Sequence, residues 1–350
     1  MRKAVAVILA CSAVAALRAQ SPAVTWTPQP SGVTARLRGV SAVSSTVAWA
    51  SGADGTVLRT TDGGRSWARL AVPGAGTLDF RDVDATSADV AHVLSIGPGE
   101  RSRIYQTTDG GATWTLRFTN PDPQAFFDAM HFADASHGLA VSDSVDGRFV
   151  IALTDDGGRS WRLVPAAGMP AALAGEGAFA ASGTNVAMVG RDRAWFATTK
   201  GRVLRTADAG RTWTVHQTPI ATGDATGIFS VAFRDALHGV VVGGNYTRER
   251  ERGDYVAVTG DGGLTWTLGS PGTSGYRSAV AALPGTPGTW LSVGPAGSDV
   301  SSDDGRTWRP AGGDGYDALT FAPGTTVGWA AGAGGRLARV EVGTAPAAVR

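Results

Sequence analysis

The segment Thr60-Thr61-Asp62-Gly63-Gly64-Arg65-Ser66-Trp67 decides the fold, because five close variants of it follow later in the same chain. Each copy has Ser or Thr, then Asp two residues later, Gly two residues after the Asp and Trp five residues after it. The later copies begin at Thr107, Thr154, Thr206, Thr259 and Ser301. Successive Asp positions are 47, 47, 52, 53 and 42 residues apart, which is enough chain for one four-stranded unit. Self-similarity at such a period indicates a repeat architecture.

Each copy predicts a tight turn between two antiparallel strands. The Asp carboxylate can accept hydrogen bonds from backbone N–H groups two or three residues ahead, and the Gly can take a positive φ without a Cβ clash. The Trp then begins the next strand. Binding of calcium is the alternative, but one carboxylate per turn cannot supply the roughly six to eight oxygens that calcium takes. We therefore predict structural roles for the Asp and the Trp of all six copies, which we call box residues: Asp62, Trp67, Asp109, Trp114, Asp156, Trp161, Asp208, Trp213, Asp261, Trp266, Asp303 and Trp308.

This pattern resembles the Asp-box, or BNR repeat, of sialidases, sortilin-type receptors and many bacterial propellers. The six boxes and the strands around them predict six blades, and a seventh begins at Tyr316 but lacks a box Asp and Trp. Residues 24–28 offer the missing outer strand, because Trp26 lies in it as the Trp of each box lies at the start of the outer strand of its blade. We predict an all-β fold, a seven-bladed β-propeller of four-stranded antiparallel blades over residues 22–341, with residues 342–350 as a tail. The N-terminal strand would close the ring and remove an exposed edge.

The composition fits many short strands joined by tight turns. The 350 residues include 49 Gly and 11 Trp, 43% are apolar and 17% are charged. The apolar content excludes a disordered chain, and there is no Gly-X-Y period of the collagen type. With a net charge of +1 the chain has no basic excess to neutralise a phosphate backbone, so we expect no binding of nucleic acid.

Residues 1–19 have the layout of a secretory signal peptide. Arg2 and Lys3 precede an uncharged apolar run of 14 residues, and Ala19 is a small residue at a plausible cleavage point. We therefore expect export to the periplasm or the outside. The only cysteine, Cys11, lies in this segment, so the mature chain would have no thiol for disulfides or metal ligation. There is also no Gly-rich phosphate loop and no Ser nucleophile elbow, and we predict no cofactor and no metal.

The starts of the inner strands carry the candidate binding residues. Aligning the seven starts places in one column Arg38, Arg81, Asp128, Phe179, Phe229, Arg277 and Asp317. The five charged members belong to consecutive blades around the ring, so Arg277, Asp317, Arg38, Arg81 and Asp128 would form an arc at one mouth of the channel. Guanidinium groups there could grip a carboxylate or an acidic peptide. The alternative interpretation is that neighbouring Arg and Asp residues of the arc pair with each other and bridge the blades.

The motif Phe-x-Asp-x-x-His-Gly, followed by a strand and a box, resembles one branch of the Asp-box propellers. That branch is the family of photosystem II stability and assembly factors with its bacterial relatives, and residues 128–161 and 229–266 carry the match. The resemblance implies an exported, non-enzymatic propeller that binds partner proteins with a basic patch. The expected partner is another protein or an acidic peptide segment, with membrane association only through that partner. We interpret His137 and His238 as packing of the turns.

Two other functions remain open. The first is a sialidase-type glycoside hydrolase, whose chemistry uses three arginines, a Tyr nucleophile activated by Glu, and an Asp. Tyr276 and Tyr316 start inner strands, but no Glu has a matching place and the Phe-Arg-Ile-Pro signature is absent, so we predict no catalytic residue. The second is a cell-surface receptor or adhesion module, which differs only in its partner.

Overall fold

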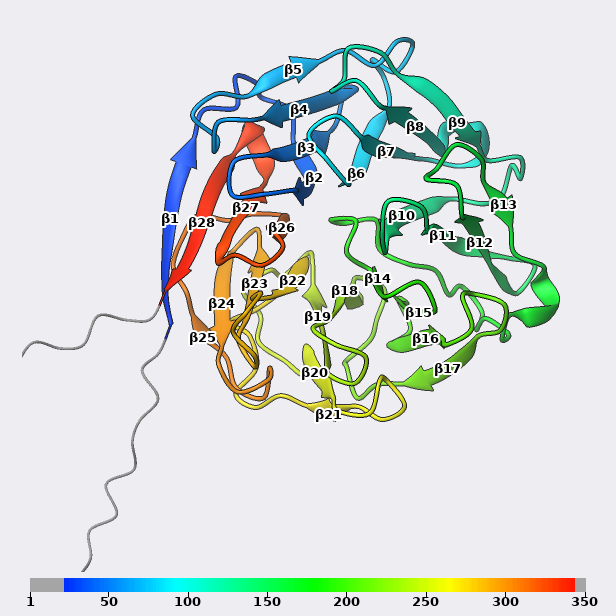
Figure 1. Ribbon diagram of the computed structural model, residues 1–350. Coiled ribbons are helices and arrows are strands. Elements are labelled where there is room, and N and C mark those ends of the chain that lie inside the picture. The colour runs from blue at the N-terminus through cyan, green and yellow to red at the C-terminus, as the bar shows by residue number, and fades with distance from the viewer. Residues whose placement is uncertain (1–21, 344–350) are drawn as a thin grey trace, which may run out of the picture.

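The computed structural model describes residues 22–343, which form seven four-stranded antiparallel sheets arranged around a central channel (Figure 1). The prediction of a seven-bladed propeller is confirmed. The proposed signal peptide, residues 1–19, lies outside the described residues, and so do residues 344–350 of the predicted tail.

The first three blades follow one another along the chain, each from its inner to its outer strand. The first blade contains β2 (Leu37–Ala42), β3 (Ala48–Gly52), β4 (Thr56–Thr60) and β5 (Ala68–Leu70). The second contains β6 (Asp79–Ala85), β7 (Ala91–Ile96), β8 (Arg103–Thr107) and β9 (Thr115–Thr119). The third contains β10 (Phe127–Phe132), β11 (Gly138–Val145), β12 (Arg148–Thr154) and β13 (Arg162–Leu163).

The next three blades repeat this order. The fourth contains β14 (Val186–Val189), β15 (Arg193–Ala197), β16 (Arg202–Thr206) and β17 (Thr214–Gln217). The fifth contains β18 (Thr226–Phe233), β19 (Gly239–Asn245), β20 (Val256–Thr259) and β21 (Thr267–Leu268). The sixth contains β22 (Ala279–Ala282), β23 (Trp290–Gly294), β24 (Gly297–Ser301) and β25 (Arg309–Pro310).

Three short 3-10 helices interrupt the connections, namely η1 (Gly99–Arg101), η2 (Ala166–Gly168) and η3 (Ala333–Gly335). None of the helices within residues 22–343 has the length and apolar character needed to cross a membrane.

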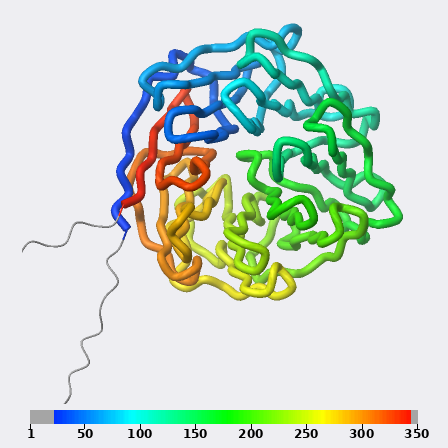
Figure 2. The backbone as a smooth tube through the Cα atoms, in the orientation of Figure 1, coloured from blue at the N-terminus to red at the C-terminus, as the bar shows by residue number. Residues whose placement is uncertain are grey.

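The seventh blade joins the two ends of the described chain. It contains β26 (Ala318–Phe321), β27 (Val327–Ala331), β28 (Leu337–Gly343) and, as its outer strand, β1 (Ala23–Gln29). Strand β1 pairs antiparallel with β28 from Ala23↔Gly343 to Gln29↔Leu337, so both ends lie at the same edge of the ring (Figure 2). The indole of Trp26 stacks on Tyr316 with ring centroids 5.1 Å apart and donates to the carbonyl of Ala311 at 3.1 Å. The predicted closure is confirmed.

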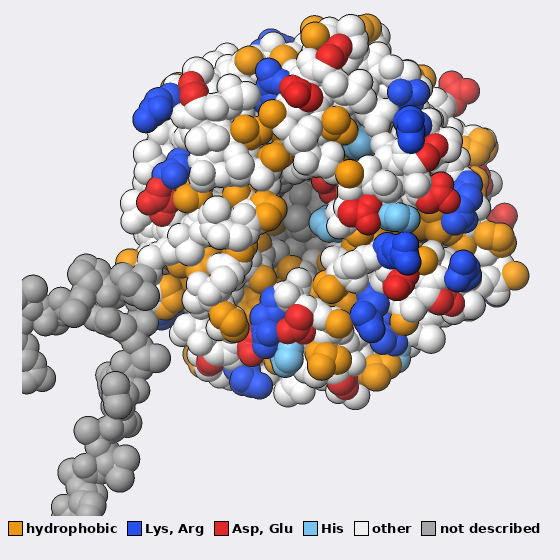
Figure 3. All heavy atoms as spheres, in the orientation of Figure 1, with side chains coloured by type: hydrophobic (Ala, Val, Ile, Leu, Met, Phe, Trp, Pro, Cys, Tyr) orange, Lys and Arg blue, Asp and Glu red, His pale blue; other side chains and the backbone are white. Residues whose placement is uncertain are grey.

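The core lies between the blades rather than within any one of them. Strands of adjoining blades contribute to the same buried clusters, as where Leu139 and Ile151 of the third blade pack with Phe196 and Leu204 of the fourth. The largest fully buried side chains include Trp49, Trp195, Trp290 and Trp329. Seen along the axis, the ring is hollowed at its centre, and charges of both signs are scattered over the visible face (Figure 3).

The box turns use their carboxylates in one repeated way. Asp62 accepts hydrogen bonds from the hydroxyl of Thr60 at 2.9 Å, from the Ser66 N–H at 3.0 Å and from the Ser66 hydroxyl at 2.6 Å. The sixth box repeats this around Asp303, with contacts of 2.8, 2.9 and 2.6 Å. The main backbone donor is thus four residues after the Asp, beyond the two or three that we expected. The positive φ angles of Gly63 (76°) and Gly64 (84°) curl the chain, which makes the turn wider than an Asx-turn.

Ring closure can be tested by removing the closing strand. A chain that lacks all residues up to 30 leaves β28 as an open edge and loses the Trp26–Tyr316 stack. We expect the free energy of unfolding to fall by about 3 kcal/mol or more, as for loss of a large core aromatic. Thermal and urea denaturation followed by circular dichroism measure this, and an unchanged midpoint would show that β1 is dispensable.

The box carboxylates predict a dependence of stability on acid. Hydrogen bonds from the Ser66 hydroxyl and N–H lower the pKa of Asp62 to about 2, whereas an unfolded Asp titrates near about 3.9. The stabilisation is therefore complete above about pH 4 and is lost as the pH falls toward about 2. We expect the Asp62→Asn variant to have a lower melting temperature than the wild type at pH 7. The difference between the two melting temperatures should shrink as the pH falls toward about 2. Asp254→Asn, in an exposed loop, is the control, and a gap that stays constant with pH would contradict the prediction.

Candidate binding site at the channel mouth

The predicted column of inner-strand residues coincides with a series of β-bulges. The register of the inner strand shifts between Leu37 and Gly39 in the first blade and between Phe80 and Asp82 in the second. The third and fifth blades shift in the same way at Asp128 and Phe229. A bulge leaves one extra residue out of the ladder and re-aims its side chain. Arg38, Arg81, Asp128 and Phe229 are those extra residues.

A pocket of about 260 Å³ lies at this end of the channel, and Arg36, Arg38 and Arg81 form its basic side. The Arg36 guanidinium is already bidentate to Asp317, with two contacts of 2.8 Å. Arg81 is paired with Asp79 at 2.8 Å. Within residues 22–343, Arg38 has no carboxylate at ion-pair distance and donates only to the carbonyl of Ala181, at 3.1 Å.

Burial accounts for the electrostatic character of Arg38. Its loss of solvent lowers the pKa of the guanidinium, and the neighbouring cations Arg81 and Arg36 act in the same direction, although Asp317 opposes them. A half-buried cation without its own counterion is costly. An anion that enters the pocket would therefore interact most favourably with Arg38.

The other walls of the pocket are aromatic. Phe179 stacks on Phe229 with centroids 3.8 Å apart and planes 5° from parallel. Tyr246 approaches both rings edge-on at 6.2 and 6.1 Å, and Tyr276 meets Phe229 at 4.6 Å. One acid, Glu249, also lines the pocket. An apolar group bound here would lie beside the arginines.

A segment of the fourth blade, residues 179–184, forms the floor of the pocket. It precedes β14 and reaches across the channel, where Arg38 and Arg81 donate to the carbonyls of Ala181 and Ala180. Ser182 donates to the carbonyl of Ser278 in the sixth blade at 2.7 Å, and Gly183 packs so closely on Asp82 that a Cβ has no room. Ala180 and Ala181 line the pocket, while residues 182–184 line a separate cavity of about 440 Å³ on the other side. The segment thus divides the channel.

The remaining charged residues of the predicted arc are buried. Arg277 pairs with Asp299 of its own blade at 2.7 Å, and Asp317 pairs with Arg36. Asp128 is 1% exposed, one of its oxygens has no hydrogen-bond partner within the described chain, and burial raises its pKa well above the usual range. No two of the five arc residues pair with each other in residues 22–343. The alternative interpretation of mutual pairing is therefore wrong for the described chain: Asp317, Arg81 and Arg277 pair with residues outside the arc, and Arg38 and Asp128 have no charged partner.

The charged and aromatic residues of the pocket include three that the sequence did not predict, namely Arg36, Tyr246 and Glu249. Arg36 stands two residues before the bulge of β2, so strand alternation could have placed it beside Arg38. Tyr246 and Glu249 belong to the long loop between β19 and β20, whose alternating charges over residues 247–254 are typical of a solvated segment. That loop folds back over the mouth, where the N–H of Tyr276 donates to the carbonyl of Glu249 at 2.9 Å.

Solved structures of known proteins share this fold. YCF48 bound to a D1 peptide superposes with a TM-score of 0.63 at 18% identity, over 90% of this chain and 96% of that one. YCF48 from Cyanidioschyzon merolae gives 0.64 at 19% identity, over 90% and 98%. The GH74 xyloglucanase from Xanthomonas campestris gives 0.62 at 16% identity, over 90% of this chain but 53% of that one. At these identities the likeness shows the fold alone.

No curated protein sequence matches this chain. A family model, PSII_BNR, matches residues 77–279, which is more than half of the chain and includes the bulges at Arg81, Asp128 and Phe229. The chain therefore belongs to the family described as photosynthesis system II assembly factor YCF48.

Proposed function

We propose that this protein is a non-enzymatic, exported scaffold that binds an acidic segment of a partner protein in the pocket at the channel mouth. The observation that carries the proposal is Arg38, a half-buried guanidinium with no carboxylate of its own within the described chain. Membership of the YCF48 family and the structure of a YCF48 with a bound D1 peptide support a peptide as the ligand. Any contact with a membrane would come through the partner.

The charges favour a single carboxylate over a long acidic run. Asp317 and Asp79 already neutralise Arg36 and Arg81, and Glu249 adds a negative charge to the wall. Arg38 is thus the cation that a bound carboxylate would stabilise most. Arg81 can donate a further hydrogen bond to the same carboxylate, because each guanidinium has five N–H groups. The stacked Phe179 and Phe229 offer a surface for an apolar side chain next to the carboxylate.

The proposal is tested by reversing the two charges at the mouth. We expect Arg38→Glu combined with Arg81→Glu to weaken binding of labelled acidic peptides at least about tenfold, which is about 1.4 kcal/mol. Fluorescence anisotropy measures the affinity, and peptides with Glu replaced by Gln show whether the carboxylate matters. The matched control is Arg65→Glu with Arg306→Glu, two exposed box arginines far from the pocket. Equal affinity of the wild type and the double variant, at unchanged melting temperature, would refute the proposal.

A second candidate function has one specific observation in its favour. The pocket brings Tyr276 and Glu249 together with Arg36, Arg38 and Arg81, and these residue types are the ones that sialidase chemistry uses. Against it, burial raises the pKa of Tyr276 strongly, which disfavours the phenolate, and Arg36 is held by Asp317. Tyr316, the other tyrosine we considered, stacks on Trp26 in the ring closure.

A sialidase-type hydrolase would turn over a sialoside, whereas a non-enzymatic scaffold would not. We expect no hydrolysis of a fluorogenic sialoside by the wild type. Turnover that disappears in Tyr276→Phe but persists in Arg65→Glu would establish the hydrolase in place of the scaffold. A receptor or adhesion role would keep the same pocket and change only the partner.

A further inference from the structure

An aromatic ring fills the seam that follows the first, second and fourth blades, next to the box turn of the next blade. Each ring belongs to the second strand of its blade. The residue just before it pairs with the first residue of that blade's own box. Ala48 pairs with Thr60, so Trp49 holds this place in the first blade. His92 and Trp195 hold it in the second and fourth. Trp49 donates to the carbonyl of Ser87 and Trp195 to that of Gly262, both in the next blade.

The third blade has a smaller residue at this place. Gly138 pairs with Thr154, so the seam residue is Leu139. A groove of about 360 Å³ lies between the third and fourth blades at this point. Its apolar lining includes Leu139, Leu153 and Met188. A hollow with an apolar floor thus lies where the first, second and fourth blades place a ring.

Four arginines surround the same groove, namely Arg162, Arg191, Arg193 and Arg211. All four are exposed. Arg191 pairs with Asp192 at 3.8 Å. Within residues 22–343, Arg162, Arg193 and Arg211 form no ion pair and donate no side-chain hydrogen bond. With Asp155 and Asp192 as the acids that line it, the groove has an excess of positive charge.

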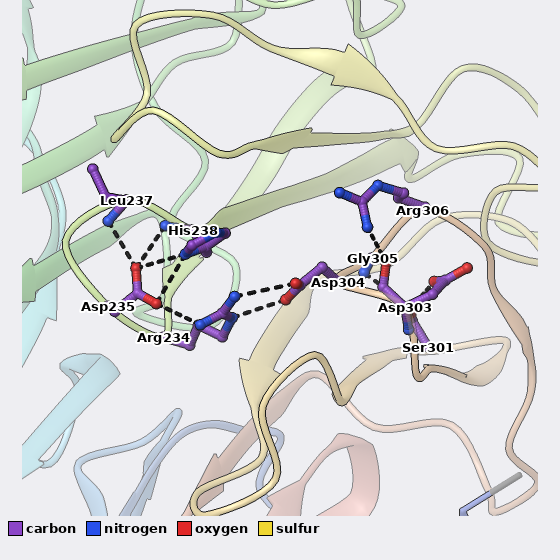
Figure 4. A network of polar contacts seen from close by, with 9 residues as sticks. All are labelled: Arg234, Asp235, Leu237, His238, Ser301, Asp303, Asp304, Gly305 and Arg306. Carbon is purple, nitrogen blue, oxygen red and sulfur yellow. Dashed lines mark hydrogen bonds and ion pairs between the residues drawn. The ribbon is translucent and has the colours of Figure 1, made fainter. Parts of the chain in front are cut away.

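The seam between the fifth and sixth blades shows what this groove lacks. Val240 holds the seam place there, and a groove of about 380 Å³ lies beside it. Its one lining carboxylate, Asp304, is already paired, because Arg234 contacts both of its oxygens, at 2.8 and 3.1 Å, and also contacts Asp235 (Figure 4). The fourth box has Ala209 where the sixth has Asp304. The third blade has Ala133 where the fifth has Arg234, so both members of this ion pair are absent from the seam between the third and fourth blades.

We propose that the groove between the third and fourth blades binds a small organic anion, a carboxylate or sulfonate on an apolar body. The arginines match the planar anion and can donate to it in bidentate fashion, while Leu139, Leu153 and Met188 cover the apolar body. The groove is built on the box turns and first hairpin turns, whereas the pocket at the channel mouth is built on the starts of the inner strands. The two sites are therefore independent, and this inference does not rest on the proposed function.

The test uses 8-anilinonaphthalene-1-sulfonate, which joins a sulfonate to an apolar ring system and becomes fluorescent when shielded from water. We expect the folded protein to bind it at a saturable site. Leu139→Trp places at this seam the ring that Trp49 and Trp195 provide at others, so it should reduce binding, and its melting temperature shows what the larger side chain costs at this buried position. Arg162→Ala with Arg211→Ala leaves the floor intact and should weaken binding at least about tenfold.

Two controls separate this site from others. Arg65 holds the same box position as Arg211, at a seam that Trp329 fills, so Arg65→Ala should bind like wild type. Arg38→Ala with Arg81→Ala alters only the channel mouth, so it should keep the binding that is lost in Arg162→Ala with Arg211→Ala. The proposal is overturned if no saturable binding is found, if the Arg162 and Arg211 double variant binds like wild type, or if binding is lost only in the Arg38 and Arg81 variant.

Discussion

The box carboxylate is the interaction on which the rest of this propeller depends. In each of six blades one Asp accepts hydrogen bonds from a hydroxyl before it and from the N–H and hydroxyl of a residue four positions later. The carboxylate is thereby satisfied from within its own turn. Its Trp is then set at the start of the outer strand, against the neighbouring blade. Repetition of this one turn connects the two outer strands in six of the seven sheets, and β1 supplies the outer strand of the seventh and closes the ring.

A ring of similar blades acquires a specific site only where the repeat is broken. At the channel mouth, the inner strands bulge and turn different side chains inward, two of them arginines and one an aromatic. The fourth blade departs further, since its inner strand begins late and residues 179–184 cross the channel instead. Their carbonyls bind Arg38 and Arg81 from the side opposite the opening. The segment 179–184 therefore both closes the pocket and orients the side chains of Arg38 and Arg81.

The seams between blades follow the same logic. Where Trp49, Trp195 or Trp329 stands, the seam is filled and the turn of the next blade is held by contact with a ring. Where Leu139 or Val240 stands, a groove remains. The two grooves differ in their charges, because the ion pair of Arg234 with Asp304 at one seam is replaced by Ala133 and Ala209 at the other. Small differences between copies of a repeat thus decide where the molecule can meet a ligand.

The architecture could be read from the sequence because its determinants are local. The spacing of Asp, Gly and Trp within eight residues specifies a turn, the period counts the blades, and Trp26 marks the strand that closes the ring. Local patterns also located the bulged column, with Arg38, Arg81 and Phe229 among its members. These features need no knowledge of which segments meet in space.

Only the tertiary structure decided how the charges are used. Asp317 pairs with Arg36 and not with its neighbours in the column, Asp128 is buried without a counterion in the described chain, and Glu249 reaches the mouth from a loop of another blade. An ion pair depends on distances of a few ångströms between residues far apart in sequence. Those distances are set by the bulges, by the segment across the channel and by the folding back of a long loop, and hydrophobic periodicity does not encode them.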